Sequence, residues 1–125
     1  MIFRNNLYIV TQCDKSDGSA LFHIDLNANH AIYKAHFPGQ PITPGVCLLQ
    51  IARELLEDYC SHDLEIRHVK NIKFLSVVSP IEHSNICISL GHITDTPGSV
   101  QCRAQVESPS GEALAKLSFT CDKRD

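Results

Sequence analysis

The chain has 125 residues, of which 43% are hydrophobic and 20% are charged, and its formal net charge is -3. This composition is typical of one soluble globular domain, so we expect a single domain over residues 1–125. A slightly acidic chain without a basic stripe argues against nucleic-acid binding. No apolar run approaches the ~20 residues of a membrane span. Polar residues interrupt the N-terminal stretch, so we expect no signal peptide and a cytoplasmic protein.

Six cysteines are spread along the chain: Cys13, Cys47, Cys60, Cys87, Cys102 and Cys121. None forms a C-x-x-C pair or lies near a histidine at zinc-ligand spacing. Four of them fall in strand-like segments, where cysteine behaves as a small apolar residue. We therefore expect reduced, mostly buried thiols and no metal, with a disulfide framework or a metal site as the alternative.

The first expected elements are two strands that form a hairpin. Residues 7–13 and 20–26 flank the sequence Asp-Lys-Ser-Asp-Gly at 14–18, which is typical of a turn.

One helix is expected, from about Pro44 to Cys60. Thr43 is a suitable N-cap, and Pro44 suits the first helical position because its missing N–H costs nothing there. Apolar residues then recur at spacings of three and four, which predicts an apolar face that is broad enough to be buried on most sides.

Four more strands are expected after the helix. Residues 64–77 predict a long strand that bends near Lys70 and Asn71, and residues 86–90 predict a second strand. Residues 99–107 and 113–121 alternate apolar and polar side chains, which is typical of half-buried strands. The turn sequences Thr-Pro-Gly at 96–98 and Ser-Pro-Ser-Gly at 108–111 join the last three strands into an antiparallel meander. One mostly apolar helix and about six antiparallel strands predict an α+β fold in which the sheet wraps the helix.

The most informative segment is the sequence His-Phe-Pro-Gly-Gln-Pro-Ile-Thr-Pro-Gly-Val at residues 36–46. It places a histidine in a loop stiffened by prolines, directly before a helix N-terminus with exposed amides. Such groups can remove a proton from the carbon next to a thioester carbonyl. The segment resembles the active-site signature of the beta-hydroxyacyl-acyl carrier protein dehydratases of fatty acid biosynthesis, which have the hot-dog fold. Residues 69–74, followed by Val78 and Pro80, are similar to the central strand of that family.

The resemblance implies a role for several residues. His36 is the expected base that removes the C2 proton, and an unperturbed imidazole pKa of ~6.5 suits that task. The backbone N–H of Gly45, with that of Val46, is expected to bind the thioester oxygen, because helix-start amides carry partial positive charge. The expected substrate-binding residues are Phe37, Gly39, Pro44, Val46 and Glu54. Elimination of water needs no cofactor, and none is expected.

Gln50 departs from the family pattern, which has Glu or Asp at this position, reaching across a dimer interface toward the histidine of the other subunit. A glutamine cannot give up or take a proton near neutral pH, and the loss of one general acid typically costs ~10²–10⁴-fold in rate. Three interpretations stay open. Gln50 orients the leaving hydroxyl while His36 moves the proton; or the acid has moved one turn on, to Glu54; or the site binds without catalysis.

The leading hypothesis is dehydration of a 3-hydroxyacyl thioester, carried by acyl carrier protein or coenzyme A, to the trans-2-enoyl form. We expect a homodimer with two composite sites. The alternatives are a hot-dog acyl thioesterase, in which Gln50 holds the attacking water, and a catalytically impaired subunit that binds acyl thioesters. A basic rim of Arg53, Arg67, Lys70 and Lys73 is a candidate surface for an acidic carrier protein.

Overall fold

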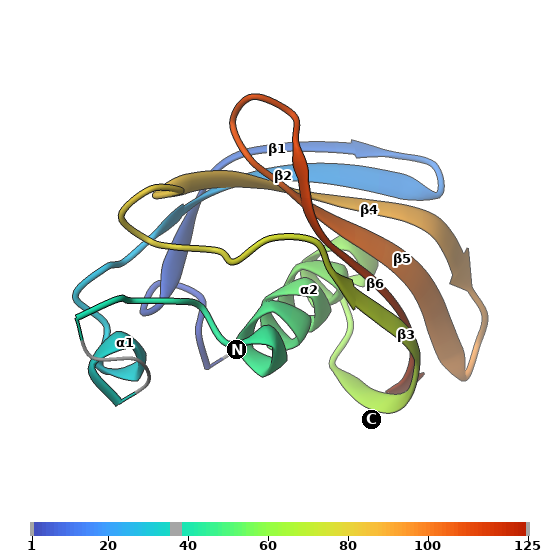
Figure 1. Cartoon of the computed structure of the whole chain (residues 1–125). Coiled ribbons are helices and arrows are strands. Elements are labelled where there is room, and N and C mark those ends of the chain that lie inside the picture. Colours follow the sequence, from blue (N-terminus) through green and yellow to red (C-terminus); the bar gives the residue numbers. More distant parts are fainter. Residues whose placement is uncertain (1, 36–38, 125) are drawn as a thin grey trace.

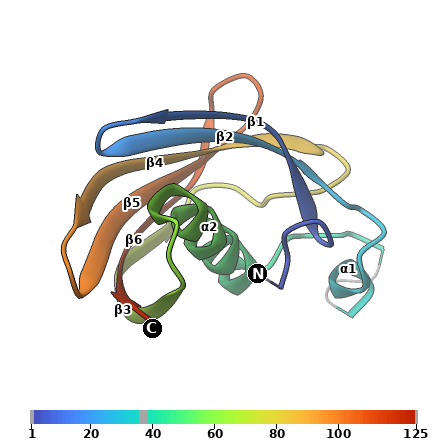
Figure 2. The ribbon, with the colours of Figure 1, turned by 180° about the vertical axis from the view of Figure 1, so that it is seen from behind.

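The fold is a strongly curved antiparallel sheet that arches over one central helix, as two opposite views show (Figure 1, Figure 2). The computed structural model describes residues 2–35 and 39–124. Within these residues the sheet has six strands in the order β1-β2-β4-β5-β6-β3. The elements in chain order are β1 (Tyr8–Ser16), β2 (Ser19–Leu26), α1 (Ala31–Ala35), α2 (Gly45–Cys60), β3 (Leu64–Phe74), β4 (Asn85–Asp95), β5 (Ser99–Glu107) and β6 (Ala113–Lys123).

The core lies between the inner face of the sheet and α2. Alternate residues of β5 are buried, namely Val100, Cys102, Ala104 and Val106, and their neighbours face outward. Ile51, Leu55 and Leu56 of α2 are completely buried against this face. Because each element hides the apolar surface of the other, neither would be stable alone.

This architecture confirms the predicted α+β hot-dog class. The helix has 16 residues, an ordinary length rather than a long one, and it begins at Gly45, one residue later than expected. The meander of β4, β5 and β6 is confirmed, and β5 has the predicted bounds. The first hairpin is tighter than expected, because Ser16 pairs with Ser19 across a turn of Asp17 and Gly18, where Gly18 has φ 80°. The short helix α1 was not predicted.

Strand β3 lies at one edge of the sheet and is irregular. Its pairing with β6 shifts register between Ile66 and His68 and again between Val69 and Asn71. The second irregularity leaves Lys70 as an extra, unpaired residue, at the place where the sequence predicts a bend. The outer edge of β3 has no strand partner among the described residues.

All six cysteines are free thiols. Cys47, Cys102 and Cys121 are buried, and Cys13 is exposed. Burial raises the pKa of both Cys102 and Cys121 to about 12. These buried thiols are core residues rather than reactive groups. Among the described residues, no helix has the length and apolar character needed to cross a membrane.

Candidate active site at the start of helix α2

The first turn of α2 is left uncapped by side chains. The sequence predicts Thr43 as the N-cap, and this was wrong: the N-cap is Pro44, with φ -60° and ψ 146°, whose side chain has no acceptor. The Thr43 hydroxyl instead shares a hydrogen bond of 2.9 Å with the Tyr33 hydroxyl. The backbone N–H of Thr43 donates to the Val78 carbonyl at 2.7 Å. Within the described residues, the N–H groups of Gly45 and Val46 have no acceptor. They are therefore available to bind an anionic oxygen.

An apolar hollow of about 360 Å³ lies beside Gly45, and Val46 is not part of its lining. Its lining combines the residues before and at the start of α2 with the end of β3 and the segment after it: Ile42, Thr43, Pro44, Gly45, Leu48, Phe74, Leu75, Ser76, Val77 and Val78. The Phe74 ring lies directly over Gly45, since a Cβ at position 45 would be only 2.2 Å from its Cζ. A glycine is therefore required for this close approach, independently of any backbone angle.

A second hollow, of about 450 Å³, adjoins the first and shares Ile42 and Val77 with it. Gly39, Ser79, Ile81 and Glu82 contribute to its walls. Of the predicted residues, Gly39 lines the second hollow, and Pro44 and Gly45 line the first. The predicted base His36 and the predicted substrate-binding residue Phe37 lie outside the described residues.

Gln50 lies one helical turn after Val46, on the same side of α2. Val46 is 73% exposed, whereas Gln50 is half-buried. The Gln50 side-chain Nε2 donates a hydrogen bond to Oε2 of Glu54, with 3.1 Å between the two atoms. Neither Gln50 nor Glu54 lines the two hollows of the same subunit.

The Glu54 carboxylate is completely buried and binds the N-terminal segment of the chain. The backbone N–H groups of Ile2, Phe3 and Arg4 donate to it at 3.1, 2.9 and 2.9 Å. The Tyr8 hydroxyl donates at 2.9 Å. The sequence did not identify the donors of this contact, because backbone amides can come from any residue type. The single available signal was a carboxylate on the apolar side of the helix, where only a partnered charge is stable.

Two opposing effects act on the pKa of Glu54. Burial raises the pKa, but the bonds from the Phe3 and Arg4 amides, Gln50 and Tyr8 outweigh it and lower the pKa below its usual range. Glu54 is therefore an ionised acceptor at neutral pH. Since an ionised carboxylate can only accept, the Gln50 amide must turn its nitrogen toward Glu54 and its carbonyl oxygen away.

The fold and this site define the class as a hot-dog domain with an open pair of helix-start amides beside an apolar depression. Residues 12–120 match the model of the ApeI-like family, described as ApeI dehydratase. The chain belongs to the ApeI-like family. The predicted resemblance to beta-hydroxyacyl-acyl carrier protein dehydratases, and with it a dehydratase of the hydro-lyase type, is confirmed.

Individual relatives agree with this assignment. The chain is 28% identical over 107 residues to the 3-hydroxyacyl-[acyl-carrier-protein] dehydratase FabZ of Latilactobacillus sakei, covering 80% of this chain and 76% of the relative. The dehydratase heterocomplex ApeI:P of Xenorhabdus doucetiae superposes with a TM-score of 0.72 at 13% identity, over 91% of this chain and 96% of that one. A hypothetical thioesterase of Streptococcus pneumoniae with coenzyme A has a TM-score of 0.67 at 11% identity, over 94% and 85%. The two structural likenesses concern the fold alone.

Proposed function

We propose that this protein removes water from a 3-hydroxyacyl thioester to give the trans-2-enoyl thioester, within fatty acid metabolism in the cytoplasm. The acyl group is carried by acyl carrier protein or by coenzyme A. The observation that carries the proposal is the uncapped start of α2, where the Gly45 and Val46 amides lack acceptors among the described residues and an apolar hollow adjoins them.

In the proposed reaction His36 takes the proton from C2, and the electron pair moves toward the thioester oxygen. The amides of Gly45 and Val46 stabilise the negative charge that develops there, which is the role that preorganised donors fill in enzymes. The C3–O bond then breaks and the C2–C3 double bond forms. The proton carried by His36 leaves with the hydroxide as water, so the overall step consumes no other reactant.

Gln50 is proposed to hold the 3-hydroxyl group of the substrate. Its amide nitrogen donates to Glu54. The carbonyl oxygen of Gln50 is therefore the group that accepts a hydrogen bond from the substrate hydroxyl. This contact orients the leaving group but gives it no proton. The proton must therefore come from His36, and turnover is expected to be ~10²–10⁴-fold slower than with an acid at position 50.

A homodimer with composite sites is part of the proposal. Exposed apolar residues are Val46 on α2, Phe74 at the end of β3, and Leu75 and Val77 after it. Val46 lies on the same side of the helix as Gln50. The unpaired edge of β3 lies next to them and could pair with a second chain. Sedimentation of a monomer at micromolar concentration would contradict this part.

A binding subunit without turnover is the second candidate, because Glu54 is occupied by five donors and is not free to replace the missing acid. One assay separates the candidates: absorbance of enoyl thioester formed from 3-hydroxyacyl substrates, with free thiol measured in parallel. A dehydratase forms enoyl product and releases no thiol, and His36→Ala abolishes its activity. Thiol release identifies a thioesterase instead. Tight binding without either product identifies the binding subunit.

A further inference from the structure

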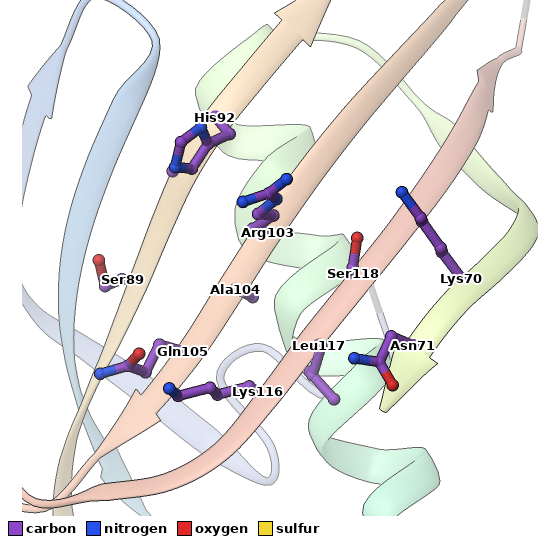
Figure 3. A pocket seen from close by; sticks show the side chains of 11 residues that line it. Lys70, Asn71, Ser89, His92, Arg103, Ala104, Gln105, Lys116, Leu117 and Ser118 are labelled. Carbon is purple, nitrogen blue, oxygen red and sulfur yellow. The ribbon is translucent and has the colours of Figure 1, made fainter. Parts of the chain in front are cut away.

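A separate hollow lies on the outer face of the sheet, on the side away from α2 (Figure 3). It has a volume of about 600 Å³ and crosses four strands. Lys70 of β3, His92 of β4, Arg103 of β5 and Lys116 of β6 surround it, together with hydroxyl and amide side chains such as Ser118. A second hollow of about 380 Å³ continues it and shares Lys70, His92, Arg103 and Ser118. The strand alternation that points apolar residues at the helix therefore presents a row of cations on the other face.

The charge of this surface is one-sided. Neither hollow has an aspartate or glutamate in its lining, although the chain carries 14 acidic residues and a net charge of -3. Within the described part of the chain, six cations form ion pairs, but Lys70, Arg103 and Lys116 form none. The hollow thus carries positive charge without a neutralising carboxylate, whereas most of the other cations form ion pairs with carboxylates.

The register of the strands brings like charges together. Lys73 of β3 pairs directly with Lys116 of β6 in the register. Like charges in directly opposite positions destabilise a sheet, by a few tenths of a kcal/mol up to about 1 kcal/mol. An anion bound beside Lys116 in the hollow would offset this repulsion.

Two β-bulges lie at the sides of the hollow. Lys70 is the extra residue between the pairs Val69–Phe119 and Asn71–Ser118. On the other side, the register of β4 and β5 shifts between Gly91 and Thr94, and His92 within this bulge has φ 48°. Bulges re-aim side chains and are frequent beside functional sites. Here both bulged strands supply a basic side chain to the same hollow.

We propose that this outer hollow binds a small molecule that carries at least two phosphate groups. An arginine fork with two lysines and hydroxyl groups matches phosphate oxygens, and the volume suits a small ligand better than a protein surface. A second copy of the chain is a poor occupant, since two cationic faces repel each other. The outer hollow lies on the opposite face of the sheet from the α2 amides. Binding there is therefore independent of the proposed dehydration activity.

The test is calorimetric titration of the whole chain with pyrophosphate, ADP and coenzyme A. We expect all three to bind at about 20 mM salt and to weaken at about 200 mM salt, because exposed charges are screened. Arg103→Gln and Lys116→Gln should each weaken binding about tenfold. The matched control is Arg67→Gln. This substitution also removes one positive charge, but from a β3 residue that forms an ion pair with Asp122. It should change the affinity less than about twofold.

The three ligands distinguish the source of the phosphates. Equal affinities assign the site to a diphosphate group. Tighter binding of coenzyme A that is lost in Arg103→Gln assigns it also to the additional phosphate of that molecule. A second measurement excludes misfolding as the cause of weaker binding by Lys116→Gln. Without ligand, the melting temperature of this variant should rise, because the repulsion between Lys116 and Lys73 is gone. Absence of heat with all three ligands overturns the proposal, as does equal loss in Arg67→Gln. Binding of an acidic carrier protein at this face, without binding of any small anion, also overturns it.

Discussion

The Gln50 amide donates a hydrogen bond of 3.1 Å to the buried carboxylate of Glu54, one helical turn away. This contact fixes which end of the amide is free. It also links Gln50 to the N-terminal segment, since Glu54 accepts from the amides of Ile2, Phe3 and Arg4. A change at either residue therefore has consequences for both chemistry and stability.

The first prediction concerns exchange of the two side chains. The double variant Gln50→Glu/Glu54→Gln keeps one amide and one carboxyl in contact and puts the acid at position 50. If the site is otherwise intact, we expect dehydration of a 3-hydroxyacyl thioester to become ~10²–10⁴-fold faster, which is the usual worth of a general acid. Gln50→Ala, which offers neither acceptor nor acid, is the control and should show no gain. A folded exchange variant without any gain would favour the binding subunit.

The single variant Gln50→Glu should behave differently from the exchange. It puts a second carboxyl beside Glu54, and two carboxylates in contact cannot both be ionised without a large cost, so their shared proton should be held to a raised pKa. Its free energy of unfolding should fall as the pH rises toward neutral and above, which urea titrations at several pH values measure. Equal stability of this variant and the native chain at neutral pH would mean that the two side chains are not in contact.

Glu54→Gln should destabilise the protein by about 2–4 kcal/mol, because several buried donors lose a charged acceptor at once. Chemical denaturation measures this difference. Glu65→Gln is a suitable control, since the Glu65 side chain is 67% exposed and its one ion pair, with Arg124, is long at 3.7 Å. A loss of comparable size in the control would show that the buried contacts are not responsible.

The stability contribution of Glu54 should depend on pH in a definite direction. Its folded-state pKa lies below the usual value of 4.5, so the unfolded chain binds more protons in this range than the folded chain. The contribution is therefore complete above about pH 5 and is lost as the pH falls through the folded-state pKa. Asp58 acts in the same direction: burial raises its pKa, but bonds from Lys15 and Arg4 lower it below the usual value of 3.8. The gap in unfolding free energy between the native chain and Glu54→Gln should narrow in acid, and a gap that widens would contradict this account.

The contact between Gly45 and Phe74 leads to a double-mutant test. Gly45→Ala puts a Cβ where the Phe74 ring lies, and the ring, which is 55% exposed, must move. We expect a destabilisation of about 1–2 kcal/mol, as for other overpacked sites, and lower activity because the ring shifts beside the amides. Phe74→Ala in the same chain should restore most of the stability, with a coupling energy of about 1 kcal/mol. Additive effects of the two substitutions would mean that the ring does not cover Gly45.

Local patterns predicted the elements that they determine directly. The alternation of β5 and β6 reflects one buried and one exposed face, so both strands lie where the sequence predicts them, although β6 continues to Lys123. The motif at residues 36–46 predicted the family and the helix start. These signals are local, and the fold does not override them.

What could not be predicted depends on contacts between distant segments. Thr43 is a good N-cap by propensity, but Tyr33 and Val78 take its polar groups, which leaves the helix start open. The donors that bind Glu54 could not be predicted, because spacing along a helix says nothing about the N-terminal segment that supplies them. Of the residues that line the cationic hollow, the predicted basic rim contained only Lys70. The hollow is formed by four strands whose order in the sheet differs from their order in the chain.

That strand order has a consequence for biosynthesis. Strand β3 pairs with β6 and with no other strand among the described residues, so about 40 residues must be made after β3 ends before its partner starts to appear. During translation the apolar inner surfaces of α2 and β3 therefore stay exposed until β6 has been made. Folding of this domain is thus expected to be completed only after β6 has emerged from the ribosome, and the intermediate before that step is the state most in need of protection by chaperones.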